Sequence, residues 1–174
     1  MFGLFKNSSK GVKVIDKVWI SKQAKWNACV QMVKMDPSLL LVAWFEETFR
    51  EIRDNPDLSQ NVIKAENISY DKTVGRMVVF SEHYPLSSVE QDIFVKLQLK
   101  EAPVLSSLEE PIFMTFGGER TIEIMKKLGV GDQEIIGHPM VTKSIRRAQE
   151  SIAKKTGTNY PATSSKEWFT LNLK

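Results

Sequence analysis

The spacing of apolar and polar positions changes along the chain and predicts alternating strands and helices. Residues 12–20 form a first extended segment, and residues 21–36 carry apolar side chains at helical spacing. Ser21 is a candidate N-cap of that helix, and Pro37 ends it. The continuous apolar run at 38–45 suits a central strand that is covered on both faces. The first quarter of the chain therefore predicts part of a buried parallel sheet.

The middle of the chain continues this alternation. A helix is predicted to begin with the acidic pair Glu46 and Glu47, because acidic side chains are favourable at the positive, N-terminal end of the helix dipole. Residues 61–68 and 76–80 read as two further strands, separated by a turn-rich segment. A second helix is predicted after Pro85, with Ser87 as its cap, and residues 102–111 read as a short strand or turn.

Residues 117–155 read as two helices joined by a loop. Ile122, Met125 and Leu128 are predicted to face inward on the first helix, and Gly129 is placed to end it in a left-handed conformation. The second helix begins at Pro139 and carries one apolar stripe and one charged stripe. The apolar stripe contains Val141, Ile145, Ala148 and Ile152, and the opposite stripe contains Lys143, Arg146, Arg147 and Glu150.

These elements predict an α/β fold with a three-layer, mostly parallel sheet of about four to five strands and a C-terminal helical extension. The 174 residues, 42% of them apolar, are enough for one core. We expect a mobile N-terminal arm at 1–12, one domain at 13–156 and a tail at 157–174. In that tail, Trp168 and Phe169 could dock a last short element.

The composition says more about the cellular compartment of the protein than about the kind of partner it binds. The single cysteine, Cys29, excludes an internal disulfide framework and is expected to be a small buried residue. No apolar run approaches the length of a membrane span, and the first residues lack the apolar stretch of a signal peptide. We therefore expect a cytoplasmic protein. A net charge of +3 with scattered lysines does not by itself argue for nucleic acid.

The search for chemistry finds no complete catalytic or metal-binding motif. The sequence contains no phosphate-binding glycine loop, no nucleophile elbow and no zinc-protease motif, so we expect no catalytic residue and no cofactor. His83 and His138 lie far apart without ligand partners, so no metal is expected. Glu82 and His83 follow a predicted strand, where doubly wound folds bind ligands, and are ligand candidates together with Arg120. The alternative for Glu82 and His83 is a polar turn ended by Pro85.

The charged stripe of the last long helix is a candidate partner surface. Arg146 and Arg147 could grip a phosphate or an acidic partner, together with Lys143 and Glu150, although a solvated helix face explains them as well. The tryptophans do not interleave with a basic stripe, so single-stranded nucleic acid is disfavoured.

One stretch carries a resemblance to a known family. The run "FGGERTIEIMKKLGVGDQEIIGHPMVTKSIRRAQESIAKK", residues 116–155, resembles the end of the second nucleotide-binding domain of SecA, the preprotein translocase motor, where it enters the scaffold helix. Residues 17–47 and 75–91 are similar to earlier parts of the same domain, in the same order, so the resemblance spans about residues 14 to 155. It implies a RecA-like sheet of the P-loop NTPase fold in a shortened and degenerate form.

The motifs that the motor uses on nucleotide are missing from the positions that the resemblance assigns to them. The arginine-finger helix is replaced by "SSVEQDIFVKLQL", and Glu90, Gln91 and Asp92 cannot place a cation against phosphate. The resemblance therefore implies the fold of the SecA domain for this chain, but not the ATPase activity.

The leading hypothesis is a non-catalytic module that binds a protein, either a translocase component or a SecA-type ATPase. One alternative is a nucleotide-binding half-site or ATPase component completed by a partner, with Glu82, His83, Arg120 or Arg146 as candidates. The second is a nucleic-acid-binding helicase remnant. On the leading hypothesis neither ATP nor nucleic acid is a partner.

Overall fold

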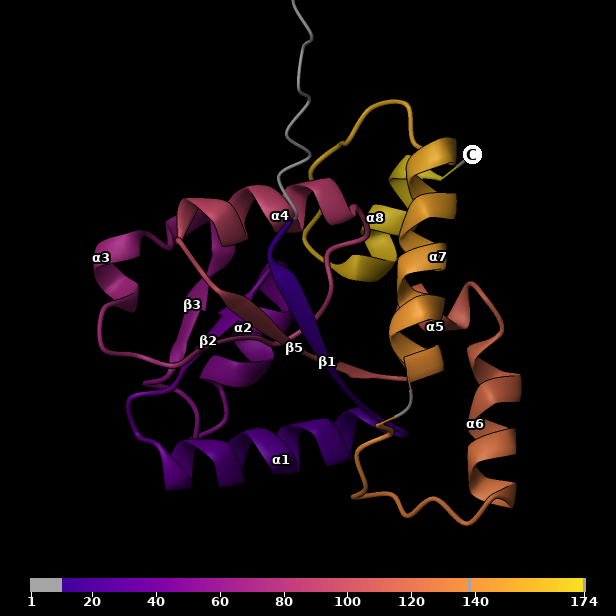
Figure 1. The fold of residues 1–174 in the computed structure, drawn as a ribbon, viewed down its shortest axis with the longest axis horizontal. Coiled ribbons are helices and arrows are strands. Elements are labelled where there is room, and N and C mark those ends of the chain that lie inside the picture. Colours follow the sequence, from indigo (N-terminus) through magenta and orange to yellow (C-terminus); the bar gives the residue numbers. More distant parts are fainter. Residues whose placement is uncertain (1–10, 138, 174) are drawn as a thin grey trace, which may run out of the picture.

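The computed structural model describes residues 11–137 and 139–173 and contains one five-stranded sheet (Figure 1). All neighbouring strands pair in parallel, in the order β1-β5-β4-β2-β3. The strands are β1 (Lys13–Trp19), β2 (Leu40–Ala43), β3 (Val62–Lys64), β4 (Val78–Phe80) and β5 (Glu101–Ser107). The predicted α/β class with a parallel sheet and a C-terminal helix is confirmed.

Helices cover both faces of the sheet and its carboxyl end. They are α1 (Lys22–Met35), α2 (Glu46–Arg53), α3 (Tyr70–Thr73), α4 (Ser87–Lys96), α5 (Pro111–Met114), α6 (Gly118–Lys127), α7 (Pro139–Lys155) and α8 (Ser165–Asn172), with a short 3₁₀ turn at Ala65–Asn67. Figure 1 shows α1 and α4 on opposite sides of the sheet, while α6, α7 and α8 lie together to one side of the strands.

Three apolar clusters hold these layers together. One cluster packs α1 and α2 against one face of the sheet, and it includes Cys29, which is fully buried as expected. A second cluster packs α4 against the other face around Phe80 and Phe94, whose ring centroids lie 4.7 Å apart. The third lies at the carboxyl end and joins α5, α7 and α8 through Ile112, Ile152 and Trp168. The tail therefore shares a core with the preceding helices.

Local signals explain some of the helix boundaries. The Ser21 hydroxyl accepts a hydrogen bond from the amide of Ala24 at 3.1 Å, as an N-cap should. Gly129 has φ of 77° and ends α6, which is the left-handed conformation predicted for it. Within 139–155, Ile145, Ala148 and Ile152 are buried, whereas the charged stripe is exposed.

Several details differ from the sequence prediction. The helix α3 lies in the segment predicted to be rich in turns, and β3 covers only part of the strand predicted at 61–68. The N-cap of α4 is Leu86, and the predicted cap Ser87 is the first helical residue. The segment predicted as a short strand or turn is β5, a seven-residue strand between β1 and β4. Leu128 is 71% exposed, because it follows the last turn of α6 instead of lying beneath it.

Some predictions fall outside the described residues. Among them are the expected N-terminal arm at residues 1–10 and His138, which was not expected to bind a metal. Within residues 11–137 and 139–173, the helices are too short or too polar to span a lipid bilayer.

Candidate functional site

The two ligand candidates that follow β4 are both buried. Glu82 and His83 are each 5% exposed and lie where the chain leaves the carboxyl end of the strand. This is the edge at which parallel α/β sheets bind ligands. The bonds made by each side chain decide whether either one is free to act on a ligand.

Both carboxylate oxygens of Glu82 accept hydrogen bonds from the residues that follow β2. One of its oxygens accepts hydrogen bonds from the amides of Trp44 at 3.1 Å and Phe45 at 3.3 Å. The other oxygen accepts from the Thr48 hydroxyl at 2.8 Å. Burial raises the pKa of Glu82 to about 7, although the charge of Lys25 acts in the opposite direction. Glu82 therefore fastens the start of α2 to β4.

Lys25 supplies a buried positive charge next to Glu82. Its ammonium group donates to the backbone carbonyl of Ser81 at 2.8 Å and forms an ion pair with Glu110 at 2.5 Å. Burial by itself would lower the pKa of Lys25, but the nearby carboxylate of Glu110 leaves that pKa raised. The sequence reasoning missed this residue. Its signal was its position four residues before Cys29, on the buried side of α1.

His83 lies between two carboxylates. Its Nδ1 lies 2.8 Å from Glu90 Oε1 and its Nε2 lies 2.9 Å from Asp16 Oδ1. Burial by itself would lower the histidine pKa, but the charge of Glu90 and the bonds to both acids raise it to about 10. The ring is therefore an imidazolium whose two N–H groups both donate. Neither nitrogen is available to a ligand.

The same cluster attaches α7 to the sheet. Gln149 of α7 donates to Glu90 Oε2 and to the backbone carbonyl of Tyr84, both at 2.9 Å. Burial by itself would raise the pKa of Asp16, but His83, with smaller contributions from Thr142 and Arg146, leaves it lowered. We call Asp16, His83, Glu90 and Gln149 the histidine brace, because they join β1, the end of β4, α4 and α7.

The tail closes over the carboxyl edge of the sheet. Asn159 Oδ1 accepts hydrogen bonds from the Tyr84 hydroxyl at 2.9 Å and from Trp168 Nε1 at 2.7 Å. The amide of Glu47 donates to the carbonyl of Thr163 at 3.0 Å. Trp168 is fully buried, and its ring centroid lies 6.0 Å from that of Tyr84. The edge that a ligand would approach is therefore covered by residues 159–168.

The remaining candidates lie on exposed helix faces. Arg120 is exposed on α6, and the described residues include no hydrogen bond or ion pair that joins it to Glu82 or His83. All four candidate contact residues of α7 are exposed: Lys143, Arg146, Arg147 and Glu150. Of these four, Arg146 is close enough to the histidine brace for its charge to contribute to the lowered pKa of Asp16. Among the described residues, no group of three or more His, Cys, Asp or Glu side chains could hold a metal ion.

An apolar groove opens between α5, α6 and α7. It has a volume of about 640 Å³, and its floor is formed by buried Leu108, Ile112, Ile145 and Ala148. Large apolar side chains remain exposed at its mouth: Phe116 at 42%, Leu128 at 71% and Ile135 at 49%. We call this surface the α6–α7 groove. Concentrated exposed apolar surface of this kind is typical of sites that bind a partner or a ligand.

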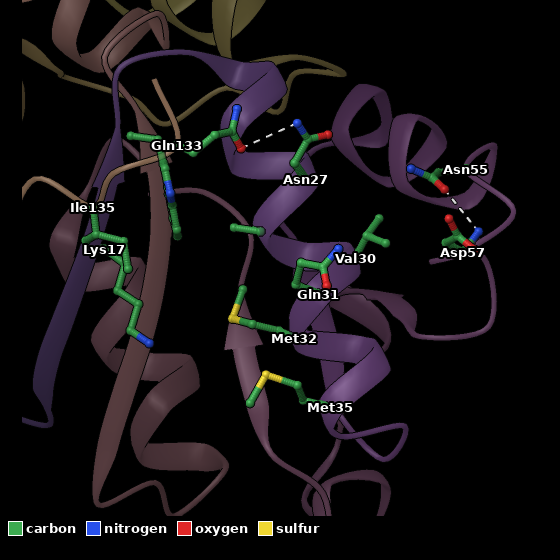
Figure 2. Close-up of a pocket in the computed structure, with 12 residues that line it drawn as sticks. Lys17, Asn27, Val30, Gln31, Met32, Met35, Asn55, Asp57, Gln133 and Ile135 are labelled. Atoms are coloured by element: carbon green, nitrogen blue, oxygen red, sulfur yellow. Dashed lines mark hydrogen bonds between the residues drawn. The ribbon is translucent and has the colours of Figure 1, made fainter. Parts of the chain in front are cut away.

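A second groove runs beside α1 and is more polar. Figure 2 shows Lys17 and Ile135 on one side of it, with Met32 and Met35 on the facing side of α1. Its volume is about 730 Å³. Asn27 and Gln133, which also line it, form a long hydrogen bond of 3.5 Å across one end. Among the described residues that line it, Trp19 alone is buried, so this groove has no comparable apolar floor.

Comparison with known proteins identifies relatives of part of the chain. No family model matches it. A segment is 49% identical over 49 residues to the protein translocase subunit SecA of Prosthecochloris aestuarii, which is 28% of this chain. It is 42% identical over 55 residues to SecA of Chlorobium phaeobacteroides and 45% identical over 49 residues to SecA of Chloroherpeton thalassium.

These matches cover 5% of the length of each relative. They therefore relate a segment of the chain to SecA and leave the rest of that protein without a counterpart in the comparison. The chain contains a SecA-related segment of 49 to 55 residues within a five-stranded parallel α/β fold.

Proposed function

We propose that this chain is a non-catalytic, SecA-related module that acts through protein–protein contacts and is linked to protein translocation. Its partner is a translocase component or a SecA-type ATPase. The observation that carries the proposal is the contrast between the buried ligand candidates and the exposed helices α6 and α7. Glu82 and His83 spend their polar atoms on internal bonds, while α6 and α7 present exposed charged and apolar surface.

The carboxyl edge supports a structural role more than a nucleotide site. A phosphate would need amide groups or cations at this edge. Here the amides of Trp44 and Phe45 are bonded to Glu82, and the ammonium of Lys25 is bonded to Glu110 and Ser81. Glu82 and the histidine brace add buried carboxylates, which would repel phosphate.

Binding to the purified SecA-type motor from the same cell tests the proposal directly. Biolayer interferometry with the full chain should show saturable binding. The double variant Lys143→Glu and Arg147→Glu should weaken it about tenfold, because each reversal places repulsion on the contact face. Lys34→Glu, an exposed reversal on α1, is the matched control and should leave binding unchanged.

The alternatives predict different results in the same samples. A nucleotide half-site predicts that ATP or ADP with magnesium raises the melting temperature. A ligand at a concentration of 100 Kd stabilises the folded state by about 2.7 kcal/mol. A nucleic-acid-binding remnant predicts strongly salt-dependent binding to oligonucleotides. If the motor does not bind and either of these signals appears, the contact proposal is wrong.

A further inference from the structure

The outer edge of β1 is open along the middle of the strand. In the register of β1 with β5, the odd-numbered residues of β1 turn their main-chain N–H and C=O groups toward β5, and the amide of Leu108 accordingly donates to the Trp19 carbonyl at 2.9 Å. The main-chain groups of Val14, Asp16 and Val18 therefore point away from the sheet. β1 stands at the end of the strand order, so among the described residues no other strand pairs with this side.

Both ends of this edge are already used by other parts of the chain. At the start, the side-chain amide of Gln91 accepts a hydrogen bond from the Val12 amide at 2.7 Å and donates to the Val12 carbonyl at 3.0 Å. At the other end, the backbone amide of Ile136 donates to the Val18 carbonyl at 2.7 Å. The edge therefore accepts backbone and amide partners where the fold brings them within reach.

The open section between these ends contains Val14 and Asp16. Among the described residues, none bonds to the main-chain N–H or C=O group of either one. The side chain of Asp16 is 4% exposed, but the residue as a whole is partly exposed, so its accessible surface lies mostly on the main chain. A hollow of about 290 Å³ borders both residues, and Ile136, Pro139 and Val141 line it as well. The main-chain groups of Val14 and Asp16 are therefore accessible to a partner.

An extended peptide backbone suits this edge better than a helix, whose backbone groups are bonded internally. The N–H and C=O groups of a strand repeat at the spacing of β1, so a segment of about three residues can bond to Val14 and Asp16 together. The side chains of an added strand alternate between two faces, as those of β1 do. On the face of Val14 they would meet apolar Ile136 and Val141. On the opposite face they would border the polar groove that Lys17 lines. The matching segment therefore alternates apolar and polar residues.

We propose that the open edge of β1 binds an extended segment of a protein partner, with alternating apolar and polar residues, as an additional strand of the sheet. This inference rests on the proposed contact function and states the form in which the partner is recognised. Pro139 and Val141 at the start of α7 line the same hollow, so a single strand fits better than the sheet of a second copy. Lys13 leaves the edge clear, because its ammonium group is bonded to Glu101 of β5 at 3.0 Å.

Amide hydrogen exchange followed by NMR tests the edge residue by residue. In the free chain, the amides of Val14 and Asp16 should exchange at least about tenfold faster than that of Ile15, which faces β5. The probe is a seven-residue peptide of alternating valine and threonine, capped at both ends. At saturation it should slow the exchange of Val14 and Asp16 at least about tenfold and change that of Ile15 much less.

Matched peptides separate backbone pairing from side-chain contact. The amides of alternate residues in a strand point to opposite edges, so only one alternate set can face β1. One peptide is N-methylated on its valines and another on its threonines, and both keep the length and side chains of the probe. Fluorescence anisotropy with the full chain and fluorescein-labelled peptides should show that one methylated peptide binds at least about tenfold more weakly than the probe. The other should bind nearly as well as the probe.

A pair of proline variants locates the binding edge on the protein. Val14→Pro removes an N–H group that points away from the sheet, and proline is tolerated at such positions of edge strands. It should weaken the probe at least about fivefold. Val62→Pro is the matched control on β3, the opposite edge, where the bond from the Leu41 amide to the Asn61 carbonyl shows that the Val62 N–H also points outward. It should leave binding unchanged. Circular dichroism and melting curves confirm that both variants are folded.

The inference is overturned if the amides of Val14 and Asp16 are already protected in the free chain, if the two methylated peptides bind alike, or if the probe does not bind. It is also overturned if Val62→Pro weakens binding as much as Val14→Pro does. A dimer in sedimentation equilibrium that Val14→Pro dissociates would show that a second copy occupies the edge.

The two proposals fail separately. Motor binding that leaves the exchange of Val14 and Asp16 unchanged contradicts the edge inference alone. Peptide pairing at the edge without motor binding contradicts the proposed function alone.

Discussion

Replacement of His83 by glutamine is expected to cost the protein a large part of its stability. His83 is the positive member of the histidine brace, and its side chain is 2% exposed between Asp16 and Glu90. In His83→Gln, an amide of similar length can still donate one hydrogen bond but carries no charge. Two carboxylates are then left buried without their cation.

The magnitude follows from the burial of both acids. Removal of one partner from a buried ion pair typically costs about 3–5 kcal/mol, because the other charge remains uncompensated. For a chain of this length, each kcal/mol shifts the melting temperature by about 2–4 °C. We therefore expect His83→Gln to melt about 10 °C below the parent protein at pH 6.5. Lys127→Gln, which removes an exposed charge on α6, is the matched control and should melt within about 2 °C of the parent.

The dependence on pH separates the lost charge from a simple packing defect. Because the folded-state pKa of His83 is raised from 6.5 to about 10, its contribution is complete below pH 6.5 and is lost as the pH rises through about 10. The difference between parent and variant should therefore shrink from pH 6.5 to pH 10. Urea unfolding followed by circular dichroism measures it. A loss below about 1 kcal/mol at pH 6.5, or a difference that is constant to pH 10, would refute the ionic brace.

Three further outcomes test other parts of the structure. Glu82 has a pKa raised from 4.5 to about 7, so the parent protein should lose stability as the pH rises through this interval; Glu82→Gln should lack this slope and gain about 1–3 kcal/mol at pH 8 in urea unfolding. Gln98 has φ of 55° after α4, so Gln98→Gly should gain up to about 1 kcal/mol, and an unchanged melting temperature would contradict strain at this position. Trp168→Ala should cost about 3–5 kcal/mol and make residues 157–173 sensitive to limited proteolysis; resistance equal to the parent would show that the tail does not depend on this anchor.

The ligand candidates show where sequence reasoning reached its limit. A polar pair after a strand predicts either a ligand site or a turn, and Glu82 and His83 instead form internal braces. Their bonds reach Asp16, 67 residues before His83, and Glu90 in turn is bonded by Gln149, 59 residues away. The order of the strands in the sheet brings these residues together. A local sequence pattern cannot show contacts between residues so far apart in the chain. Lys25 was missed for the same reason, since its partner Glu110 is 85 residues away.

The strand β5 illustrates the same dependence on neighbours. Its residues include Pro103, Ser106 and Ser107, which weaken a strand prediction on local grounds. Pairing with β1 along its full length, and with β4 on the other side, nevertheless places it inside the sheet. Leu128 was misplaced because helical spacing continues past Lys127, whereas the helix itself ends there.

The sequence by itself determined five helices and the class of the sheet, whereas the short helices α3 and α5 were not predicted from it. The five are α1, α2, α4, α6 and α7. Caps, the dipole partners of α2 and the apolar stripe of α7 are local features, and local interactions within a few residues are enough to select these elements. Only the tertiary structure decided which charged side chains became internal and which surface stayed open. Burial of Lys25, Glu82 and His83 is stable only with partners from distant elements. The α6–α7 groove lies where α5, α6 and α7 meet, and a Cβ on Gly118 would lie 2.9 Å from the carbonyl carbon of Phe113, so this glycine allows α6 to start close to α5.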